Sequence, residues 1–376
     1  MFLKFIIDGK RANAIALVFS LLFVMAVPLA AQDRYHRTNL VSDIPGVALR
    51  ADANLVNPWG IAFSATSPVW IADNGTGVST IYRADGSPIP LVVTIPGPSA
   101  GATAAPTGLI FNGTPSFVVS SNGKSGPAIF IFATEDGTIS GWSPAVDLQN
   151  AILMVNNSSP GGVDNSTLGA VYKGLATGSK GSNQFLFATN FRDAVVEIYD
   201  SNFHFVKSFT DPNAPAGFAP FGIQNINGQL FVTFAKQNDE KHDDVAGPGN
   251  GVIDIFDTDG NLLSRFASGG ALNSPWGLAL APDGFGSFSQ RLIVGNFGDG
   301  HISAFGIHSG MFEGQLKDIL GQAMNINGLW GLKFGTGSAL SGPRNHLLFT
   351  AGIADESHGL FGVIRPVGDD NSQGDE

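Results

Sequence analysis

A short motif that recurs along the whole chain constrains its fold more than any other feature. Its clearest copies are residues 57–63, 274–280 and 328–334, each of which carries a Trp-Gly pair between apolar residues. Weaker copies surround Gly108, Gly174 and Gly222. Measured between their glycines, the six copies follow one another at intervals of 48 to 66 residues, close to the roughly 40 to 50 residues of one blade of a β-propeller. The sequence therefore predicts a repeat protein with six structural units.

Each repeat contains further short runs of β-branched and aromatic residues bounded by Gly, Pro, Asn or Asp, which is the pattern of strands joined by turns. The two strands that follow the motif strand are expected at residues 69–74 and 78–83, 117–122 and 128–132, 185–190 and 194–200, 230–236 and 251–256, 291–296 and 301–305, and 346–351 and 359–364. The first repeat adds a fourth strand at residues 91–95.

The last repeat is one strand short, whereas a strand at residues 38–44 belongs to no repeat of its own. If this N-terminal strand completes the last sheet, the ring closes and no sheet edge stays exposed between the ends. The predicted fold is an all-β, six-bladed β-propeller closed by its N-terminal strand. The repeat glycine is expected near the axis, where backbones converge, and the preceding tryptophan is expected to wedge between neighbouring sheets.

The N-terminus has the pattern of a secretory signal peptide. Lys4, Lys10 and Arg11 precede an apolar run at residues 14–29, and cleavage is expected after Ala31. An uncleaved membrane anchor is the alternative, because the run approaches spanning length. We expect a signal peptide at residues 1–31, a propeller at 32–367 and a disordered acidic tail at 368–376, in a secreted or periplasmic protein.

Composition narrows the classes of partner. The chain has 20 Lys and Arg against 31 Asp and Glu, a net charge of -11, which argues against binding nucleic acid or an anionic membrane. It has no cysteine, so thiolate metal sites and disulfides are excluded. We expect a soluble monomer whose partners are a small molecule, a glycan or an envelope protein.

Four segments carry a resemblance to a known family: residues 38–43, 55–60, 235–251 with its Lys-His-Asp-Asp stretch, and 327–335. With these segments the chain resembles six-bladed propellers of the NHL and YVTN type. More specifically, it resembles an uncharacterised family of secreted bacterial propellers, some of which end in a PEP-CTERM sorting signal. The resemblance implies a fold and an extracytoplasmic location without an established activity. Residues 369–376 lack the Pro-Glu-Pro motif and the hydrophobic tail of the anchored members.

In a propeller, the turn before each inner strand and the turn after each second strand lie on one face, around the mouth of the central channel. Ligands of repeat proteins commonly bind on such a face. The candidate ligand-binding residues at these positions are Asn57, Trp59, Asp73, Asn74, Asn122, Asn190, Lys236, Trp276, Asn296 and Trp330. Amides beside aromatic planes suit hydroxyl-rich ligands such as sugars. The alternative is that these asparagines serve only as turn residues, as Asn-Gly pairs often do.

The loop at residues 237–250 gathers acidic residues in a chain that has few charges. His242, Asp243 and Asp244 are candidate ligands for Ca²⁺ or another divalent metal, because carboxylates suit calcium and histidine suits transition metals. Their spacing lacks the alternating pattern of a dedicated calcium loop. A solvated surface loop is the alternative interpretation.

No nucleophile elbow, P-loop or His-Glu-x-x-His zinc motif occurs in the sequence. Two hypotheses of different classes therefore stand. The first is an exported, non-catalytic propeller that binds a ligand or envelope partner at its channel mouth. The second is a metal-dependent hydrolase, lactonase or lyase that uses Asp73, the channel asparagines, and His242 or Asp243.

Overall fold

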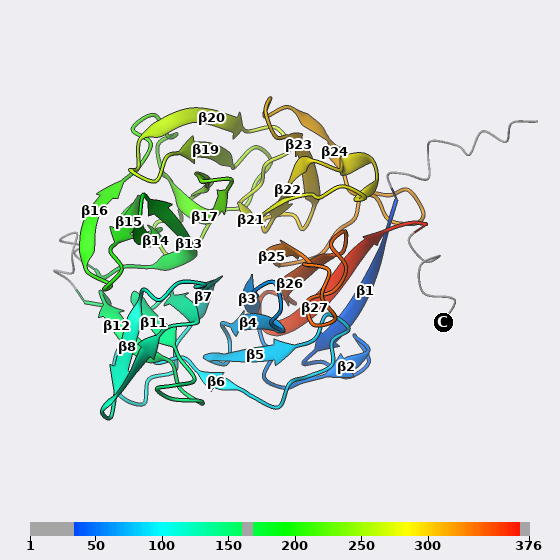
Figure 1. Cartoon of the computed structure of the whole chain (residues 1–376). Helices are drawn as coiled ribbons and strands as arrows, with labels where there is room; N and C mark the ends of the chain where they lie inside the picture. Colours follow the sequence, from blue (N-terminus) through cyan, green and yellow to red (C-terminus); the bar gives the residue numbers. More distant parts are fainter. Residues whose placement is uncertain (1–33, 160–167, 369–376) are drawn as a thin grey trace, which may run out of the picture.

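The protein forms six β-sheets arranged in a ring about a central axis (Figure 1). This computed structural model describes residues 34–159 and 168–368. Within those ranges the only helical segment is a short 3₁₀ turn at Gly286–Phe288, and no helix has the length and apolarity to cross a membrane. The six-bladed, all-β fold predicted from the repeats is confirmed. The predicted signal peptide and all but the first residue of the predicted acidic tail lie outside the described residues.

Each blade runs from an inner strand at the axis to an outer strand at the rim. Blade 1 contains β3 (Pro58–Ala62), β4 (Val69–Asp73), β5 (Val78–Tyr82) and β6 (Val93–Thr94), and blade 2 contains β7 (Pro106–Phe111), β10 (Phe130–Thr134), β11 (Thr138–Trp142) and β12 (Ile152–Asn156). Blade 3 contains β13 (Tyr172–Lys180), β14 (Asn183–Asn190), β15 (Val195–Tyr199) and β16 (Phe205–Phe209). Blade 4 contains β17 (Phe218–Ile226), β18 (Gln229–Lys236), β19 (Val252–Phe256) and β20 (Leu262–Ser268), and blade 5 contains β21 (Pro275–Leu280), β22 (Arg291–Asn296), β23 (Ile302–Gly306) and β24 (Phe312–Gln315).

Blade 6 joins the two ends of the propeller. It contains β25 (Leu329–Phe334), β26 (Leu347–Ile353) and β27 (His358–Pro366), followed by β1 (Tyr35–Ser42) and the short β2 (Arg50–Ala51). β1 pairs antiparallel with β27, with Thr38 opposite Val363. The N-terminal strand that belongs to no repeat of its own is thus the fourth strand of the last sheet. β1 and β27 lie side by side in Figure 1.

Blade 2 differs from the sequence prediction. We expected residues 117–122 to be its second strand, but β8 (Val118–Ser121) pairs instead with β9 (Lys124–Pro127) in a separate hairpin. Phe117 has a positive φ of 60° and packs its ring 5.3 Å from that of Phe203 in blade 3, so the chain turns away from its own blade. The second strand of blade 2 is β10, which pairs with β7.

The inner strands pack so closely that the repeat glycines have no room for a side chain. A Cβ placed on Gly222 would lie 2.2 Å from the carbonyl oxygen of Trp276 in the next blade. Buried threonine hydroxyls bridge the same backbones: Thr189 Oγ1 accepts from Gly174 N–H at 2.7 Å and donates to Phe221 O at 2.7 Å in the next blade. The predicted role of the glycines in close approach at the axis is therefore observed.

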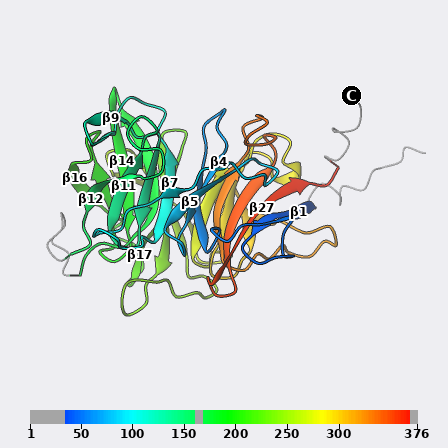
Figure 2. The same cartoon turned by 90° about the horizontal axis from the view of Figure 1, so that it is seen from below.

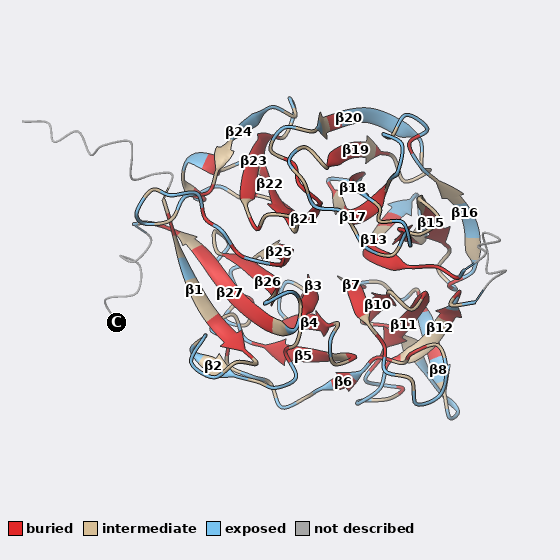
Figure 3. Cartoon of the chain, turned by 180° about the vertical axis from the view of Figure 1, so that it is seen from behind, coloured by how far each residue is buried: buried red, intermediate tan, exposed pale blue. Residues whose placement is uncertain are grey.

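The core lies between adjacent sheets and continues around the ring, with exposed residues gathered on the outermost strands (Figure 3). Loops leave the sheets at the two opposite faces of the disc (Figure 2). One face holds the starts of the inner strands, and the other holds their ends.

Candidate functional site

An aromatic floor closes the channel near the starts of the inner strands. Trp59, Trp276 and Trp330 each precede a repeat glycine, and their side chains meet at the axis together with Phe191 and Phe221. The rings of Trp59 and Trp330 stack with their centroids 3.4 Å apart. All three tryptophans are buried, so they contact one another, and no ring face is presented to a ligand at a rim. The sequence analysis expects these tryptophans to lie between neighbouring sheets, whereas the structure places them together at the axis.

Lys173 occupies the same position in blade 3 that tryptophan occupies in blades 1, 5 and 6. Its Nζ lies 5.1 Å from the centroid of the Trp59 ring and 5.8 Å from that of Phe191. The ammonium forms a close ion pair with Glu135 and lies 3.5 Å from Asp243 Oδ1. Burial disfavours the charged amine, but these carboxylates outweigh it and raise the pKa of Lys173 above its ordinary value. Lys173 is therefore a fixed positive charge on the aromatic floor.

Two predicted asparagines connect the carboxylates around this ammonium. Asn74 Nδ2 donates to Glu135 Oε2 at 2.8 Å, and its Oδ1 accepts from Asn57 Nδ2 at 3.2 Å. Asn57 Nδ2 also donates to Glu356 Oε1 at 3.2 Å, and its Oδ1 accepts from Trp330 Nε1 at 3.2 Å. A continuous hydrogen-bonded network therefore runs across the mouth of the channel.

Glu356 enters this network from a backbone turn of unusual conformation. Ala354, Asp355 and Glu356 all have positive φ, between 52° and 62°, although none is glycine. Strained backbone of this kind is more frequent at functional sites than elsewhere. Burial, followed by repulsion from Glu135, raises the pKa of Glu356 to about 7. This side chain is therefore able to take up or release a proton near neutral pH.

The acidic loop at residues 237–250 folds back over the mouth. His242 Nδ1 lies 2.8 Å from Asp243 Oδ1, and this hydrogen bond, assisted by Lys173, holds the pKa of Asp243 near 2. Burial raises the pKa of Asp244. One ligand atom from each of Glu135, His242 and Asp243 lies within 4.8 Å of the other two, which makes this trio the candidate metal centre. Asp244, the third residue of the metal set predicted from the sequence, lies outside that trio, and the predicted set stays a prediction.

We name the residues described so far the mouth cluster: Asn57, Asn74, Glu135, Lys173, His242, Asp243, Asp244 and Glu356. The other polar residues predicted from turn positions have different surroundings. Asp73 is fully buried and accepts a hydrogen bond from Thr80 N–H at 2.9 Å, and burial raises its pKa well above the ordinary value. The carboxylate of Asp73 therefore lies inside blade 1, where it accepts a backbone hydrogen bond, and it is not among the residues of the mouth cluster.

Two further asparagines bond to their own surroundings. Asn190 Nδ2 donates to Glu197 and Asp193, at 2.7 and 2.8 Å, and its Oδ1 accepts from backbone N–H groups. Asn296 Nδ2 donates to Ala271 O at 2.8 Å. These side chains fix turns, as the alternative interpretation of the asparagines expected.

Asn122 and Lys236 are both exposed. Asn122 lies in the turn between β8 and β9 with φ of 51°, followed by Gly123 with φ of 75°. This is the Asn-Gly geometry of a two-residue hairpin. Lys236 ends β18. No interaction connects either side chain to the mouth cluster within the ranges that the structure describes.

Sequence reasoning missed three members of the cluster: Glu135, Lys173 and Glu356. The signal for Lys173 was present, because it precedes a repeat glycine as the tryptophans do. Glu135 follows the second strand of its blade, but that strand was assigned to the wrong segment. The position of Glu356 depends on a left-handed turn that no local pattern in the sequence predicts.

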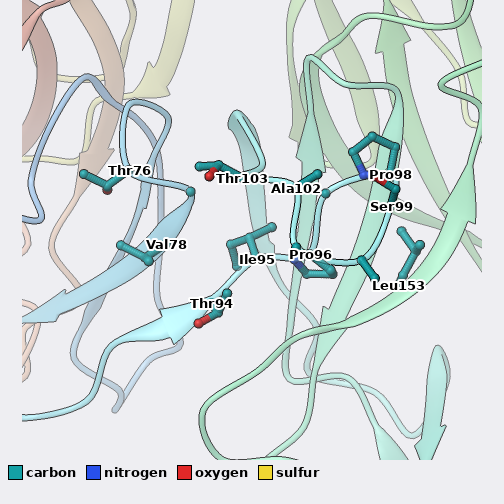
Figure 4. Close-up of a pocket in the computed structure, with 14 residues that line it drawn as sticks. Thr76, Val78, Thr94, Ile95, Pro96, Pro98, Ser99, Ala102, Thr103 and Leu153 are labelled. Atoms are coloured by element: carbon teal, nitrogen blue, oxygen red, sulfur yellow. The ribbon is translucent and has the colours of Figure 1, made fainter.

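A cavity of about 520 Å³ lies elsewhere, between blades 1 and 2. It is lined by residues 76–78 and 94–103 and by Leu153, whose hydroxyl, proline and aliphatic groups are drawn in Figure 4. None of the lining residues is ionisable. This cavity therefore offers little for acid-base or metal chemistry.

The fold and the polar mouth define the class of protein, a six-bladed β-propeller with a charged channel entrance. The solved structure of streptogramin B lyase superposes with a TM-score of 0.51 at 13% identity, covering 89% of this chain and 99% of that one. A virginiamycin B lyase from Staphylococcus aureus superposes with a TM-score of 0.50 at 13% identity, covering 88% and 99%. At this identity the likeness shows the fold alone.

Sequence comparison places the chain in a family. Uncharacterized protein R648 of Acanthamoeba polyphaga mimivirus is 30% identical over 332 residues, which cover 86% of this chain and 78% of that protein. Uncharacterized protein L690 of the same virus is 30% identical over 300 residues, covering 78% and 77%. The chain therefore belongs to the family of these viral proteins. No family model matches it. The predicted membership of a secreted bacterial family stays a prediction.

Proposed function

We propose that this protein is an exported, non-catalytic propeller that binds a small polar ligand at the mouth cluster. The ligand we propose is a glycan that bears hydroxyl and amine groups. The observation that carries the proposal is the excess of acceptors over donors: Glu135, Asp243, Asp244 and Glu356 surround the single ammonium of Lys173. Export rests on the sequence of residues 1–31.

The chemistry of the cluster selects for hydrogen-bond donors. Ionised carboxylates only accept hydrogen bonds, so hydroxyl and ammonium groups are their natural partners. Asp243 is more accessible than Glu135, because its side chain is 61% exposed and that of Glu135 is 13% exposed. Because the tryptophans are buried, recognition depends on polar contacts, and stacking of a sugar on an exposed aromatic ring plays no part.

Titration calorimetry with a β-1,4-linked glucosamine tetramer tests the proposal. We expect saturable binding that weakens at least tenfold for the fully N-acetylated tetramer, which lacks the amines. Asp243→Asn should weaken binding to a similar extent, because it removes the exposed charge. Asp239→Asn is the matched control, since Asp239 lies exposed in the same loop. Equal affinity for both tetramers, or no binding, would overturn the proposed ligand class.

A second candidate function is a metal-dependent hydrolase or lyase. The convergence of Glu135, His242 and Asp243 favours it, because these are suitable ligand types for a divalent cation. Glu356, with a pKa near 7, would supply a general acid or base beside such a centre. Lys173 opposes it, because its ammonium already neutralises two of the three candidate ligands.

Thermal unfolding distinguishes this candidate. A metal that binds only the folded protein raises the melting temperature. After chelator treatment, addition of Ca²⁺, Mg²⁺, Mn²⁺ or Zn²⁺ should raise it if the trio is a metal centre, and His242→Ala should abolish the rise. Absence of any rise would remove the support for a metal-dependent enzyme and leave the non-catalytic proposal standing.

A further inference from the structure

The opposite mouth of the channel holds a second site, formed where the inner strands end. Two adjoining cavities of about 360 and 270 Å³ lie there. Gln224, Asn225 and Lys333 line both of them, so the two cavities surround one shared set of polar side chains. Together the cavities fall in the size range of small-molecule sites.

The repeat explains how space and polar groups come together at this mouth. The second residue after each repeat glycine has the equivalent place in all six blades, and in every blade it lines one or both cavities. These residues are Ala62, Ile110, Ala176, Gln224, Ala279 and Lys333. The three alanines leave room, whereas blades 4 and 6 carry long polar side chains at the same level. Gln224 and Lys333 therefore reach one space from either side of blade 5.

The accessible lining of both cavities is mostly polar. Leu109, Leu175 and Leu278 belong to the lining strands, but their side chains are buried in the core between the sheets. Each inner strand is the end strand of its sheet, so in the described part of the chain no strand pairs with its edge toward the axis. Such an edge presents unpaired backbone N–H and C=O groups. The cavities therefore offer hydrogen-bond donors and acceptors to a hydroxylated ligand.

Of the residues that line the two cavities, only Lys333 is charged. Its Nζ lies 5.3 Å from the centroid of the Phe63 ring, and no carboxylate of the described residues lies within ion-pair distance of it. Burial alone lowers the pKa of Lys333, whereas neighbouring carboxylates raise the pKa of Lys173. The ammonium of Lys333 therefore lacks the anionic partner that a desolvated charge requires.

Gln224 supplies an amide beside this ammonium. Its Nε2 lies 3.5 Å from Asn225 O, the limit of hydrogen-bond distance, so the amide is held only weakly. Asn225 is fixed instead, because its Nδ2 donates to Thr177 O at 2.8 Å and its Oδ1 accepts from Gly228 N–H at 3.0 Å. The amide of Gln224 is therefore available to donate to a ligand and to accept from it.

We propose that this mouth binds a small hydroxylated monocarboxylate of the sugar-acid class. Its carboxylate pairs with Lys333, and its hydroxyls bond to Gln224 and to the free edges of the inner strands. One ammonium matches one negative charge, and the net charge of -11 on the chain disfavours polyanions. A neutral sugar would leave the ammonium unpaired. A carboxylate without hydroxyls would leave the amide and the strand edges without ligand contacts.

The two mouths of the channel select opposite charges. The mouth cluster is rich in carboxylates and suits a ligand with amines, whereas this site carries one unpaired ammonium and suits an anion. The aromatic floor of Trp59, Trp276 and Trp330 closes the channel between them. The inference is therefore independent of the function proposed above.

Saturation-transfer NMR titrations of the protein with glucuronate, glucose and acetate test the inference. Glucose has the ring and hydroxyls of glucuronate without its carboxylate, and acetate has the carboxylate without the hydroxyls. We expect glucuronate to bind at least tenfold more tightly than either of the other two. Inorganic phosphate at the same concentration should not displace it.

Lys333→Met should weaken glucuronate binding at least tenfold and leave glucose unchanged. Lys333→Arg should retain binding, because it keeps the charge. Lys207→Met is the surface control, because Lys207 lies exposed on β16 at the rim, and it should bind glucuronate as the wild type does. Lys333→Met should fold normally, since it replaces an unpaired charge by an apolar side chain, and its melting temperature verifies this.

Four results would overturn the proposal. They are undiminished glucuronate binding by Lys333→Met, equal affinity for glucuronate and glucose, equal affinity for glucuronate and acetate, and no binding of glucuronate to the wild type. Displacement of glucuronate by phosphate would likewise contradict a site for a hydroxylated monoanion.

Discussion

Lys173 shows how one residue changes the character of a repeat position. Five of the six side chains that precede the repeat glycines are uncharged, and the sixth is this lysine. Packed against Trp59 and Phe191, its ammonium has little access to water. It is stable there because Glu135 compensates it. Each of these two charges therefore depends on the other, and neither should be replaceable alone.

A double-mutant cycle tests this dependence. Lys173→Met should lower the free energy of unfolding by about 3 kcal/mol at neutral pH, because it leaves Glu135 buried without its counter-ion. Combining it with Glu135→Gln should recover much of the loss, since the amide oxygen can still accept from Asn74. Chemical denaturation of the four proteins measures the coupling. Additive losses would show that the two charges act independently.

Glu356 predicts a specific dependence of stability on pH. Its ordinary pKa is 4.5, and the folded protein raises it to about 7. Between these values the folded state keeps a proton that the unfolded chain has lost, so stability falls as pH rises through this window. Glu356→Gln removes the titration. The variant should gain on the wild type from pH 5 to pH 8, by about 2 kcal/mol, as measured by urea denaturation at both values. A constant difference would contradict the raised pKa.

At the scale of elements, the inner strands are held by contacts between backbones. The repeat glycines and the threonines that bridge neighbouring blades leave almost no space around the axis. The axial cavity at the level of the glycines measures only about 40 Å³. Substitutions that add side-chain volume at the repeat glycines should therefore be among the least tolerated in the molecule.

Gly222→Ala should destabilise the protein by roughly 3 kcal/mol or more, because its Cβ would overlap the carbonyl oxygen of Trp276. Gly113→Ala is the matched control. Gly113 is exposed in a loop, and its new Cβ would meet only the ring edge of Phe111 at 3.1 Å. The control should lose less than about 1 kcal/mol. Similar melting temperatures for the two variants would contradict the close packing described at the axis.

The repeated local pattern of the blades explains which elements the sequence predicted correctly and which it did not. The strands and their order followed from periodic motifs, because each blade repeats the same local pattern. The prediction of a blade strand at residues 117–122 was wrong, because a strand of a separate hairpin has the same β-branched composition as a strand of a blade. That error removed Glu135 from the candidate site. Asn57 and Asn74 were found because their turns repeat, whereas the contacts that join them to Glu356 span distant segments and leave no local signal.

At the scale of the whole molecule, the N-terminal strand holds the ring closed. Tyr35 on β1 is fully buried, donates from its hydroxyl to Phe285 O at 3.0 Å, and stacks near Phe288. Its backbone N–H also donates to Lys317 O at 2.8 Å. β1 therefore links blade 6 to blade 5 as well as completing the sheet.

Tyr35→Ala should lower the free energy of unfolding by roughly 3 to 5 kcal/mol, because it empties a packed site at this closure. Tyr35→Phe keeps the ring and loses the hydrogen bond to Phe285, so its cost should be about 1 kcal/mol. Calorimetric unfolding of both variants measures the difference. An equal effect of the two would show that the hydroxyl, and not the packing of the ring, fastens the strand.

The central claim is that the mouth cluster is where this propeller binds its ligand. The most direct test is the melting temperature of wild type, Asp243→Asn and Asp239→Asn with the glucosamine tetramer and with each divalent ion. Asp243 is accessible enough for its amide to leave the fold intact. We predict a ligand-dependent rise in the wild type and in Asp239→Asn that is lost in Asp243→Asn. A rise that survives in Asp243→Asn, or no rise with any of these ligands, would contradict the claim.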